Sequence, residues 1–308
     1  MIAFVFPGQG SQKVGMGRAL ADAYPEARAA FDEAEAALPG LRQVIFEGPE
    51  DQLVLTQNAQ PAILTVSIAA QRVLAARGIE PAFVAGHSLG EYSANVAAGT
   101  MAFADAVRVV RRRGQYMQDA VPVGAGAMAA ILGLDSETVA RACEEAAQGE
   151  IVSPANINGA GQVVIAGATA AVRRAGERAK ALGAKRVIPL AVSAPFHCAL
   201  LTPAEARLEP DLRALRVQDP RVPVVANVDA EPKRDAASAI EALVRQVSAP
   251  VRWEQVVQRL ASEGVTNYVE VGPGAVLSGL VRKIHKDARV FSFASPDDLA
   301  AVEAGLRA

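Results

Sequence analysis

The residues best suited to do chemistry lie in Gly86-His87-Ser88-Leu89-Gly90, a Gly-x-Ser-x-Gly segment. The apolar run Phe83-Val84-Ala85 before it predicts a buried strand, and the Ala-rich run after it predicts a helix. Glycines on both sides of Ser88 allow the sharp turn that lifts a serine hydroxyl clear of its sheet. Ser88 is therefore the candidate nucleophile. A serine alcohol also needs a base, donors for a developing oxyanion and a group that selects the substrate.

Histidine is scarce, so few residues qualify as the general base: His87, His197 and His285. His87 adjoins the serine, and adjacent side chains on a tight turn diverge, so we expect it to be a pocket or packing residue. His285 lies in the basic run 282–286, which predicts a solvated helix end. His197 follows the apolar run Ala194-Pro195-Phe196 and is favoured as the base, with a hydrogen-bonded core histidine as the alternative.

The composition is that of a globular protein: 308 residues, 51% of them hydrophobic and 21% charged. The net charge of −2 gives no reason to expect nucleic acid or a membrane surface as the main partner. No apolar run approaches the ~18 residues that a membrane-spanning helix needs. Two cysteines, Cys143 and Cys198, without a CxxC pair or a histidine cluster, predict neither a disulfide framework nor a metal site. We therefore expect a cytoplasmic protein.

No loop for a nucleotide cofactor is predicted. Gly8-Gln9-Gly10 is followed by Lys13 where the third glycine of GxGxxG would fall, and no Gly-Lys-Ser/Thr occurs. We expect the chain to hold no cofactor.

The apolar spacing predicts alternating strands and helices, and therefore an α/β fold. Residues 124–192 differ, because their elements follow the order βαββαβ of a ferredoxin-like module. We therefore predict a discontinuous large domain, residues 1–123 and 193–308, that carries a ferredoxin-like subdomain, residues 124–192. The expected helices include 61–77, 103–120 and 237–247, and the expected strands include 83–86, 222–227 and 267–271.

Several runs, in order along the whole chain, resemble the malonyl-CoA:acyl carrier protein transacylases. They are Gly8-Gln9-Gly10-Ser11-Gln12, Gly86-His87-Ser88-Leu89-Gly90-Glu91-Tyr92, Arg113-Gly114 with Met117-Gln118, Asn156 with Gly161-Gln162-Val163-Val164-Ile165-Ala166-Gly167, Ser193-Ala194-Pro195-Phe196-His197, and Val269-Glu270-Val271-Gly272-Pro273-Gly274. Gly-x-Ser-x-Gly alone is common to many hydrolases, whereas the joint pattern is highly specific. The resemblance implies an α/β-hydrolase-like large domain with a parallel sheet.

The resemblance also implies a ping-pong reaction of fatty acid synthesis. Ser88 would take malonyl from malonyl-CoA as an ester and pass it to the phosphopantetheine thiol of acyl carrier protein, with His197 relaying the proton. The backbone N–H groups of Gln9 and Leu89 would stabilise the oxyanion, and the main-chain carbonyl of Gln246 would hold the histidine.

We expect no carboxylate to orient the imidazole. The chain order of hydrolases places an acid between serine and histidine, where no acidic residue stands out, and Asp229 follows the histidine. The prediction is therefore a dyad of Ser88 and His197, with Gln246 in support.

Substrate selection is expected to depend on Arg113, which follows the serine by 25 residues. Malonyl has a free carboxylate, and a guanidinium suits it because it can donate two parallel hydrogen bonds. Arg111 and Arg112 are expected on a solvated helix face. Phe196 resembles the malonyl-selective form of its motif, in which the ring fills the space that a 2-methyl substituent needs.

Acyl carrier protein is acidic, so a local cationic surface near the cleft is expected to receive it. Lys185 and Arg186 match the position suspected of docking the carrier in the family, while scattered solubilising charge is an equal alternative for both residues.

Three other functions are weighed against malonyl transfer. The same chemistry could serve a polyketide pathway, and the sequence does not separate the two. A serine esterase or thioesterase would use the same turn, base and oxyanion hole, but Arg113, the inserted module and the missing triad acid speak against it. A carrier-binding module without catalysis is disfavoured because every expected catalytic residue is present.

Overall fold

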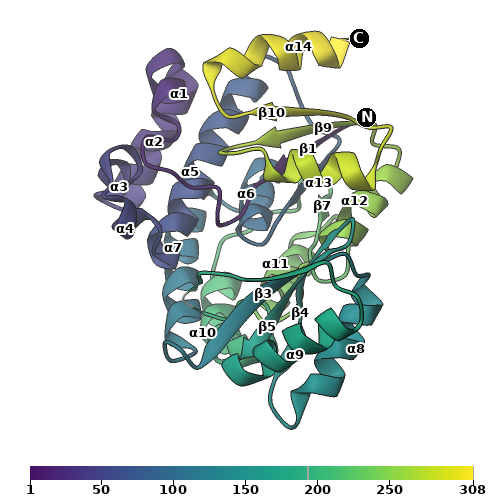
Figure 1. Cartoon of the computed structure of the whole chain (residues 1–308). Helices are drawn as coiled ribbons and strands as arrows, with labels where there is room; N and C mark the ends of the chain where they lie inside the picture. The colour runs from purple at the N-terminus through teal and green to yellow at the C-terminus, as the bar shows by residue number, and fades with distance from the viewer. Residues whose placement is uncertain (193, 308) are drawn as a thin grey trace.

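Two β-sheets organise the chain, each with its own helices. The structure is a computed structural model that describes residues 1–192 and 194–307. Ser193, where the second segment of the predicted large domain begins, and Ala308 lie outside the described residues. Figure 1 shows a larger part around one sheet and a smaller part, in teal, around the other. Within the described ranges, none of the helices combines the length and apolar character that a membrane crossing requires.

The larger sheet has β1 near its centre, between β9 and β2. In spatial order its strands are β10 (Arg289–Phe293), β9 (Asn267–Val271), β1 (Ile2–Phe6), β2 (Phe83–Gly86), β7 (Val224–Val225) and β8 (Pro232–Lys233). All neighbouring pairs are parallel except β7 with β8. Since parallel strands end at the same edge, the loops after β1 and β2 meet there, with Phe6 opposite Gly86.

Alternate residues of β1 belong to two hydrophobic cores on opposite faces of this sheet. Phe4 and Phe6 point into the larger core, and Ala3 and Val5 into the smaller one. The larger core takes buried residues from α1 (Arg18–Ala23), α2 (Pro25–Ala37), α3 (Leu41–Glu47), α4 (Glu50–Leu53), α5 (Thr56–Ala75), α6 (Leu89–Ala98), α7 (Phe103–Asp119), α10 (Thr202–Arg213), α11 (Ala236–Arg245) and α14 (Leu299–Arg307). The smaller core lies under α12 (Trp253–Ser262) and α13 (Val276–Ile284).

The second sheet is antiparallel and is covered by helices on one face. Its strands, in spatial order, are β4 (Val152–Gly159), β5 (Gln162–Ala168), β3 (Gly126–Leu132) and β6 (Arg186–Pro189). Ile131 packs in a core with α8 (Ser136–Ala147) and α9 (Thr169–Ala181). Met128 and Ala130 point to the opposite face, where they pack against Cys198 of the following segment. This helix-free face therefore adjoins the chain as it returns to the larger part.

The two parts are also joined by backbone hydrogen bonds. Ile157 N–H donates to the carbonyl of Val251 at 2.8 Å, and Val251 N–H donates to the carbonyl of Ala155 at 2.8 Å. This short parallel bridge attaches the edge strand β4 to the segment that precedes α12.

The α/β class predicted from the sequence is confirmed, and two element boundaries differ for identifiable reasons. The helix expected from residue 61 begins at Thr56, so Pro61 lies inside α5. A proline has no N–H to donate to the carbonyl four residues earlier, here that of Gln57. Arg111 Nη1 donates to this carbonyl at 3.1 Å, which replaces the missing helical bond.

The strand expected at 222–227 is reduced to the two residues of β7. The backbone N–H of Asn227 donates to Glu91 Oε2 at 3.0 Å. This N–H is therefore bonded to a side chain of α6, and pairing along the strand ends before it.

Close packing between α5 and α7 makes Gly114 a test of the fold. A Cβ at Gly114 would lie 2.6 Å from Gln57 Cα, whereas a Cβ at Gly279 of α13 would meet nothing within 4 Å. Alanine is normally better than glycine inside a helix by about 1 kcal/mol. We expect Gly114→Ala to lower the free energy of unfolding by about 1–3 kcal/mol, because overpacking outweighs propensity. Gly279→Ala should raise it in the same urea titrations; equal stabilisation by both would contradict the close approach.

Candidate active site

Ser88 lies in a strained turn between β2 and α6. Its φ of 52° and ψ of −106° fall in a region that residues with a side chain rarely adopt, at a typical cost of about 1–3 kcal/mol. The side chain of Asn227 holds the turn on both sides. Its Oδ1 accepts from Ser88 N–H at 2.8 Å, and its Nδ2 donates to the carbonyl of Gly86 at 2.7 Å.

The glycines of the turn are required by close backbone contacts. A Cβ at Gly86 would lie 1.9 Å from the carbonyl carbon of Gly90, and a Cβ at Gly90 would lie 2.0 Å from the carbonyl oxygen of Phe6. The N-terminus of α6 therefore presses directly on the ends of β1 and β2. Leu89 N–H is the first amide of α6, which has no acceptor within the helix and lies at its positive end.

His197 is in direct contact with the serine hydroxyl. Its Nε2 lies 2.7 Å from Ser88 Oγ, and its Nδ1 lies 2.9 Å from the carbonyl oxygen of Gln246. A carbonyl only accepts, so Nδ1 carries the proton and Nε2 is free to accept one from the serine. Burial, followed by the positive charge of Arg113, lowers the pKa of His197 to about 3. The imidazole is therefore a neutral acceptor.

No carboxylate among the described residues bonds to this imidazole. Asp229, the acid that follows His197 in the chain, pairs instead with Lys233 Nζ at 2.6 Å. His197 also has a positive φ, 60°, so both members of the serine–histidine contact lie on strained backbone.

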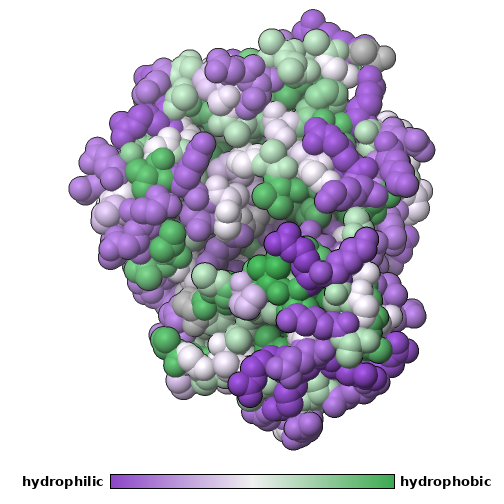
Figure 2. Space-filling view, in the orientation of Figure 1, coloured by the Kyte–Doolittle hydropathy of each residue, from purple (hydrophilic) through white to green (hydrophobic). Residues whose placement is uncertain are grey.

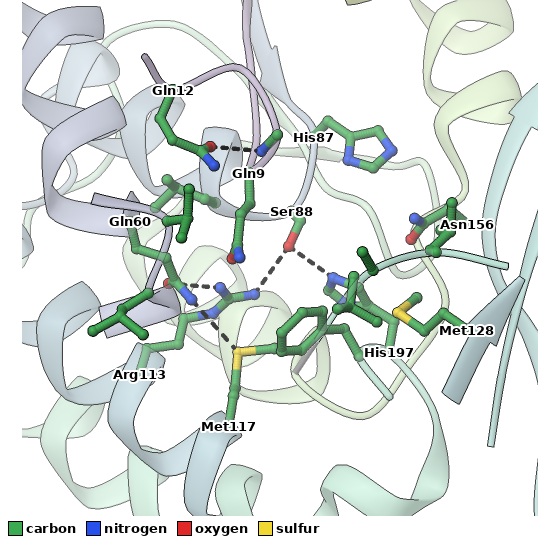
Figure 3. Close-up of a pocket in the computed structure, with 18 residues that line it drawn as sticks. Gln9, Gln12, Gln60, His87, Ser88, Arg113, Met117, Met128, Asn156 and His197 are labelled. Carbon is green, nitrogen blue, oxygen red and sulfur yellow. Dashed lines mark hydrogen bonds between the residues drawn. The ribbon is translucent and has the colours of Figure 1, made fainter. Parts of the chain in front are cut away.

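Arg113 of α7 reaches the same hydroxyl from the opposite side (Figure 3). Its side chain is 1% exposed, and its Nη2 donates to Ser88 Oγ at 3.1 Å. Two glutamine side chains accept its other bonds: Gln60 Oε1 from Nη1 at 2.8 Å, and Gln246 Oε1 from Nη2 at 2.9 Å. Its guanidinium carbon also lies 5.2 Å from the ring centre of Tyr92, within the range of a cation–π contact.

The serine opens into a cavity of about 450 Å³ between the two parts of the molecule. Gln9, Leu55 and Met117 line it from the larger part, and Met128 and Asn156 line it from the small sheet. Figure 2 shows a hollow on this face, with hydrophobic side chains at its rim. The cavity thus leads to the serine hydroxyl between apolar and polar side chains.

The structure brings most of the sequence-predicted site residues to this cavity. Gln9, Leu89 and Phe196 line it together with the serine, the histidine and Arg113, while Gln246 is fully buried behind them. Lys185 and Arg186 do not line it; both are exposed, beside and within β6.

The two remaining histidines have different surroundings. His87 lines the cavity, with Nε2 2.9 Å from Asn158 Oδ1 and its ring packed near Trp253. The prediction of a solvated His285 is wrong. Its ring is half-buried and meets Tyr268 edge-on, with Nδ1 3.1 Å from the tyrosine hydroxyl, because the end of α13 lies over β9.

Three polar residues of the site were missed by the sequence analysis: Gln60, Glu91 and Asn227. Glu91 is 1% exposed, and its Oε2 accepts from Asn227 N–H at 3.0 Å and from Gln246 Nε2 at 2.8 Å. Burial raises the pKa of Glu91 to about 7. A signal was available for Glu91, which is the one charged residue in the sequence of α6. Gln60 gave none, because it follows the polar Gln57 and Asn58 and precedes the apolar part of α5.

The described residues contain no group of three or more His, Cys, Asp or Glu side chains arranged to hold a metal ion. The polar side-chain groups nearest the serine hydroxyl are an imidazole and a guanidinium.

Comparison with known proteins agrees with this arrangement. The family described as acyl transferase domain matches residues 3–298. Malonyl CoA-acyl carrier protein transacylase of Escherichia coli (strain K12) is 51% identical over 301 residues, which cover 97% of each chain.

Solved structures give the same result. An acyl carrier protein S-malonyltransferase from Vibrio cholerae superposes with a TM-score of 0.96 at 48% identity, covering 98% of this chain and 99% of the other. PlMCAT, described as a malonyl-transacylase in complex with its type II PKS acyl-carrier protein AntF, superposes with a TM-score of 0.96 at 47% identity, covering 99% of each chain. The family resemblance of the sequence is thereby confirmed: the chain belongs to the acyl transferase family and, within it, to the malonyl CoA-acyl carrier protein transacylases.

Proposed function

We propose that this chain is an acyl-carrier-protein S-malonyltransferase, which moves malonyl from malonyl-CoA to the phosphopantetheine thiol of acyl carrier protein and supplies fatty acid synthesis. One observation carries the proposal: Ser88 Oγ lies 2.7 Å from an imidazole nitrogen and 3.1 Å from a guanidinium nitrogen. The imidazole provides the base that a serine nucleophile needs. The guanidinium provides a cation for an acyl group that ends in a carboxylate.

The first half-reaction loads the serine. Ser88 Oγ attacks the thioester carbonyl of malonyl-CoA while its proton moves to His197 Nε2. The backbone N–H groups of Leu89 and Gln9 donate to the oxyanion; such a donor is typically worth ~10² to 10³ in rate. The C–S bond then breaks, and the imidazolium returns the proton to the departing coenzyme A thiolate. A malonyl ester remains on the serine.

The second half-reaction runs the same steps with another thiol. The phosphopantetheine thiol gives its proton to His197 Nε2 and its sulfur attacks the ester carbonyl. The C–O bond breaks and the proton returns to Ser88 Oγ. Because the carbonyl of Gln246 holds the imidazole by Nδ1, at 2.9 Å, the same nitrogen serves both halves.

The length of malonyl supports Arg113 as its carboxylate partner. One methylene separates the ester carbonyl from the carboxylate, so the carboxylate must lie within a few ångströms of Ser88 Oγ. The guanidinium lies at such a distance, 3.1 Å from Ser88 Oγ. Its other partners are neutral glutamine oxygens, which do not neutralise its positive charge, so the charge can pair with the substrate carboxylate. Phe196, half-buried in the cavity wall, is proposed to exclude acyl groups that carry a 2-methyl substituent.

Docking of the carrier protein is assigned to the rim of the cavity. Lys185 and Arg186 are both exposed at the start of β6, and the other end of this strand leads to Leu190 in the cavity lining, so an acidic carrier could meet them as its prosthetic arm enters. We propose that the reaction needs no bound cofactor, because both thiol carriers are substrates, and that it takes place in the cytoplasm.

We also propose the finer description of the fold. The parallel order of β10, β9, β1, β2 and β7, with the serine after β2, supports an α/β-hydrolase-like large domain over residues 1–123 and 193–308. The antiparallel sheet with α8 and α9 on one face supports a ferredoxin-like subdomain over residues 124–192.

A second candidate function is malonyl transfer in a polyketide pathway. PlMCAT, which is 47% identical to this chain, is described with a type II PKS carrier protein. The two functions share every chemical step and differ in the carrier. An esterase is disfavoured by the buried Arg113 and by the lack of a carboxylate on the imidazole among the described residues.

Intact mass spectrometry tests the proposed function. Brief incubation with malonyl-CoA should add one malonyl group to the chain, and holo-acyl carrier protein should remove it and appear as malonyl-carrier. Ser88→Ala should form no adduct, because the ester has no oxygen to form on. An adduct that persists in Ser88→Ala, or that is lost equally fast in buffer alone, would contradict transfer through Ser88.

Arg113→Ala tests the carboxylate site. Each hydrogen bond to a charged group is worth ~1.5 to 3 kcal/mol, so kcat/KM for malonyl-CoA should fall on the order of 100-fold or more, whereas kcat/KM for acetyl-CoA should persist or rise. Arg112→Ala is the matched control, since Arg112 points away to Asp211 in a half-exposed ion pair at 3.0 Å. Equal losses on both substrates would remove Arg113 from selection.

The lowered pKa of His197 makes a prediction about pH. The base form of a histidine with a pKa of about 3 persists down to low pH, so inactivation of Ser88 by a neutral sulfonyl fluoride should keep the same rate from pH 8 down to pH 5. This reagent needs no carboxylate partner, so the ionisation of bound malonyl does not enter. Glu91, whose pKa is about 7, also titrates in this range, so the same measurement is made on Glu91→Gln; a fall in rate centred near pH 6.5 in both proteins would show an imidazole with an ordinary pKa.

A further inference from the structure

The side-chain amide of Gln246 links three parts of the site. Its Oε1 accepts from Arg113 Nη2 at 2.9 Å, and its Nε2 donates to the carbonyl of Ser88 at 2.9 Å and to Glu91 Oε2 at 2.8 Å. An amide has a donor end and an acceptor end, and its partners decide which end points where. Reversal of this amide would turn its NH₂ group toward the guanidinium, which can only donate.

Glu91 is the charged partner that favours the observed orientation. Its carboxylate, when ionised, only accepts hydrogen bonds, so the NH₂ end of Gln246 must face it. The carboxylate is itself held by the backbone N–H of Asn227 at 3.0 Å and lies in the first turn of α6, where the helix dipole favours a negative charge. The orientation of Gln246 therefore rests on a fixed group.

Arg113 depends on this arrangement because its close partners are neutral. Among the residues that the structure describes, no carboxylate forms an ion pair with it; glutamine oxygens and the serine hydroxyl accept its bonds. Glu91 lies one residue further away, beyond Gln246. It balances the buried positive charge without occupying the N–H groups that a substrate carboxylate would need.

We propose that Glu91 is a positioning residue for substrate selection: it fixes the side-chain amide of Gln246, which holds the Arg113 guanidinium against the acyl site on Ser88. This inference rests on the proposed function and deepens it. Glu91 sets the preference for an acyl group with a terminal carboxylate over a neutral one, without touching either.

The ratio of kcat/KM for malonyl-CoA to kcat/KM for acetyl-CoA tests this inference. A merely structural loss lowers the amount of active protein, which changes both values equally and leaves the ratio unchanged. Glu91→Gln keeps the shape of the side chain but replaces the charged acceptor with an amide that can also donate, so that the orientation of Gln246 then depends on weaker, neutral acceptors such as the carbonyl of Ser88. We expect the ratio to fall about tenfold or more, as for the loss of a hydrogen bond to a charged group. Assays at pH 8 keep the wild-type carboxylate ionised, since its pKa is about 7.

Glu270→Gln is the matched control. Glu270 is a second fully buried carboxylate, on β9, and it accepts from the backbone N–H groups of Leu277 and Ser278 away from the serine. Its replacement should lower thermal stability and leave the selectivity ratio unchanged. A fall of the ratio in Glu270→Gln as large as in Glu91→Gln would overturn the inference.

Gln246→Met keeps the inference testable if Glu91→Gln does not fold, because methionine has similar length and no amide. The ratio should fall in this variant as well, and adding Glu91→Gln to it should change the ratio by less than about threefold, since both act through one contact. An unchanged ratio in folded Glu91→Gln or in Gln246→Met overturns the inference while malonyl transfer by the wild type stands. A wild-type chain that forms no malonyl ester overturns the proposed function, and the inference with it.

Discussion

The buried positive charge of Arg113 restricts which side chains can surround Ser88. Arg113 lies almost out of solvent, where a guanidinium must find acceptors for its hydrogen bonds. A direct carboxylate partner would satisfy it, and would also fill the positions that we propose for the substrate carboxylate. Gln60 and Gln246 instead supply neutral oxygens. The charge is thereby held in place and stays available.

That arrangement explains why distant segments have to converge behind the serine. α5 brings Gln60, α7 brings Arg113, and the end of α11 brings Gln246. Gly114 permits the close approach of α5 and α7. Pro61 is accommodated inside α5 because Arg111 donates to the Gln57 carbonyl, which has no helical partner. Gln246 contacts both groups that flank the serine hydroxyl. Its main-chain carbonyl bonds to His197, and its side-chain oxygen bonds to Arg113.

Features of the structure that depend on local sequence patterns were predicted, whereas features that depend on contacts between distant residues were largely not. The turn at Ser88 and most helices follow from glycine placement and apolar spacing, and scarcity of histidine singled out His197. Arg113 needed the family resemblance, because three successive arginines look alike in sequence. Glu91 was not predicted, since its partners lie 136 and 155 residues away. The shortened strand β7 was missed for the same reason: the N–H that ends it is bonded to that unforeseen carboxylate.

The main-chain carbonyl on His197 Nδ1 has a consequence for what the acyl ester can react with. Burial disfavours the imidazolium most, and the nearby guanidinium repels it. The neutral carbonyl on Nδ1 offsets these effects less than a carboxylate would, so this histidine is a weak base. A thiol is a much stronger acid than water, so its deprotonation depends less on the strength of the base. For the proposed malonyl ester, the acidity of the acceptor thiol therefore favours transfer to sulfur over transfer to water.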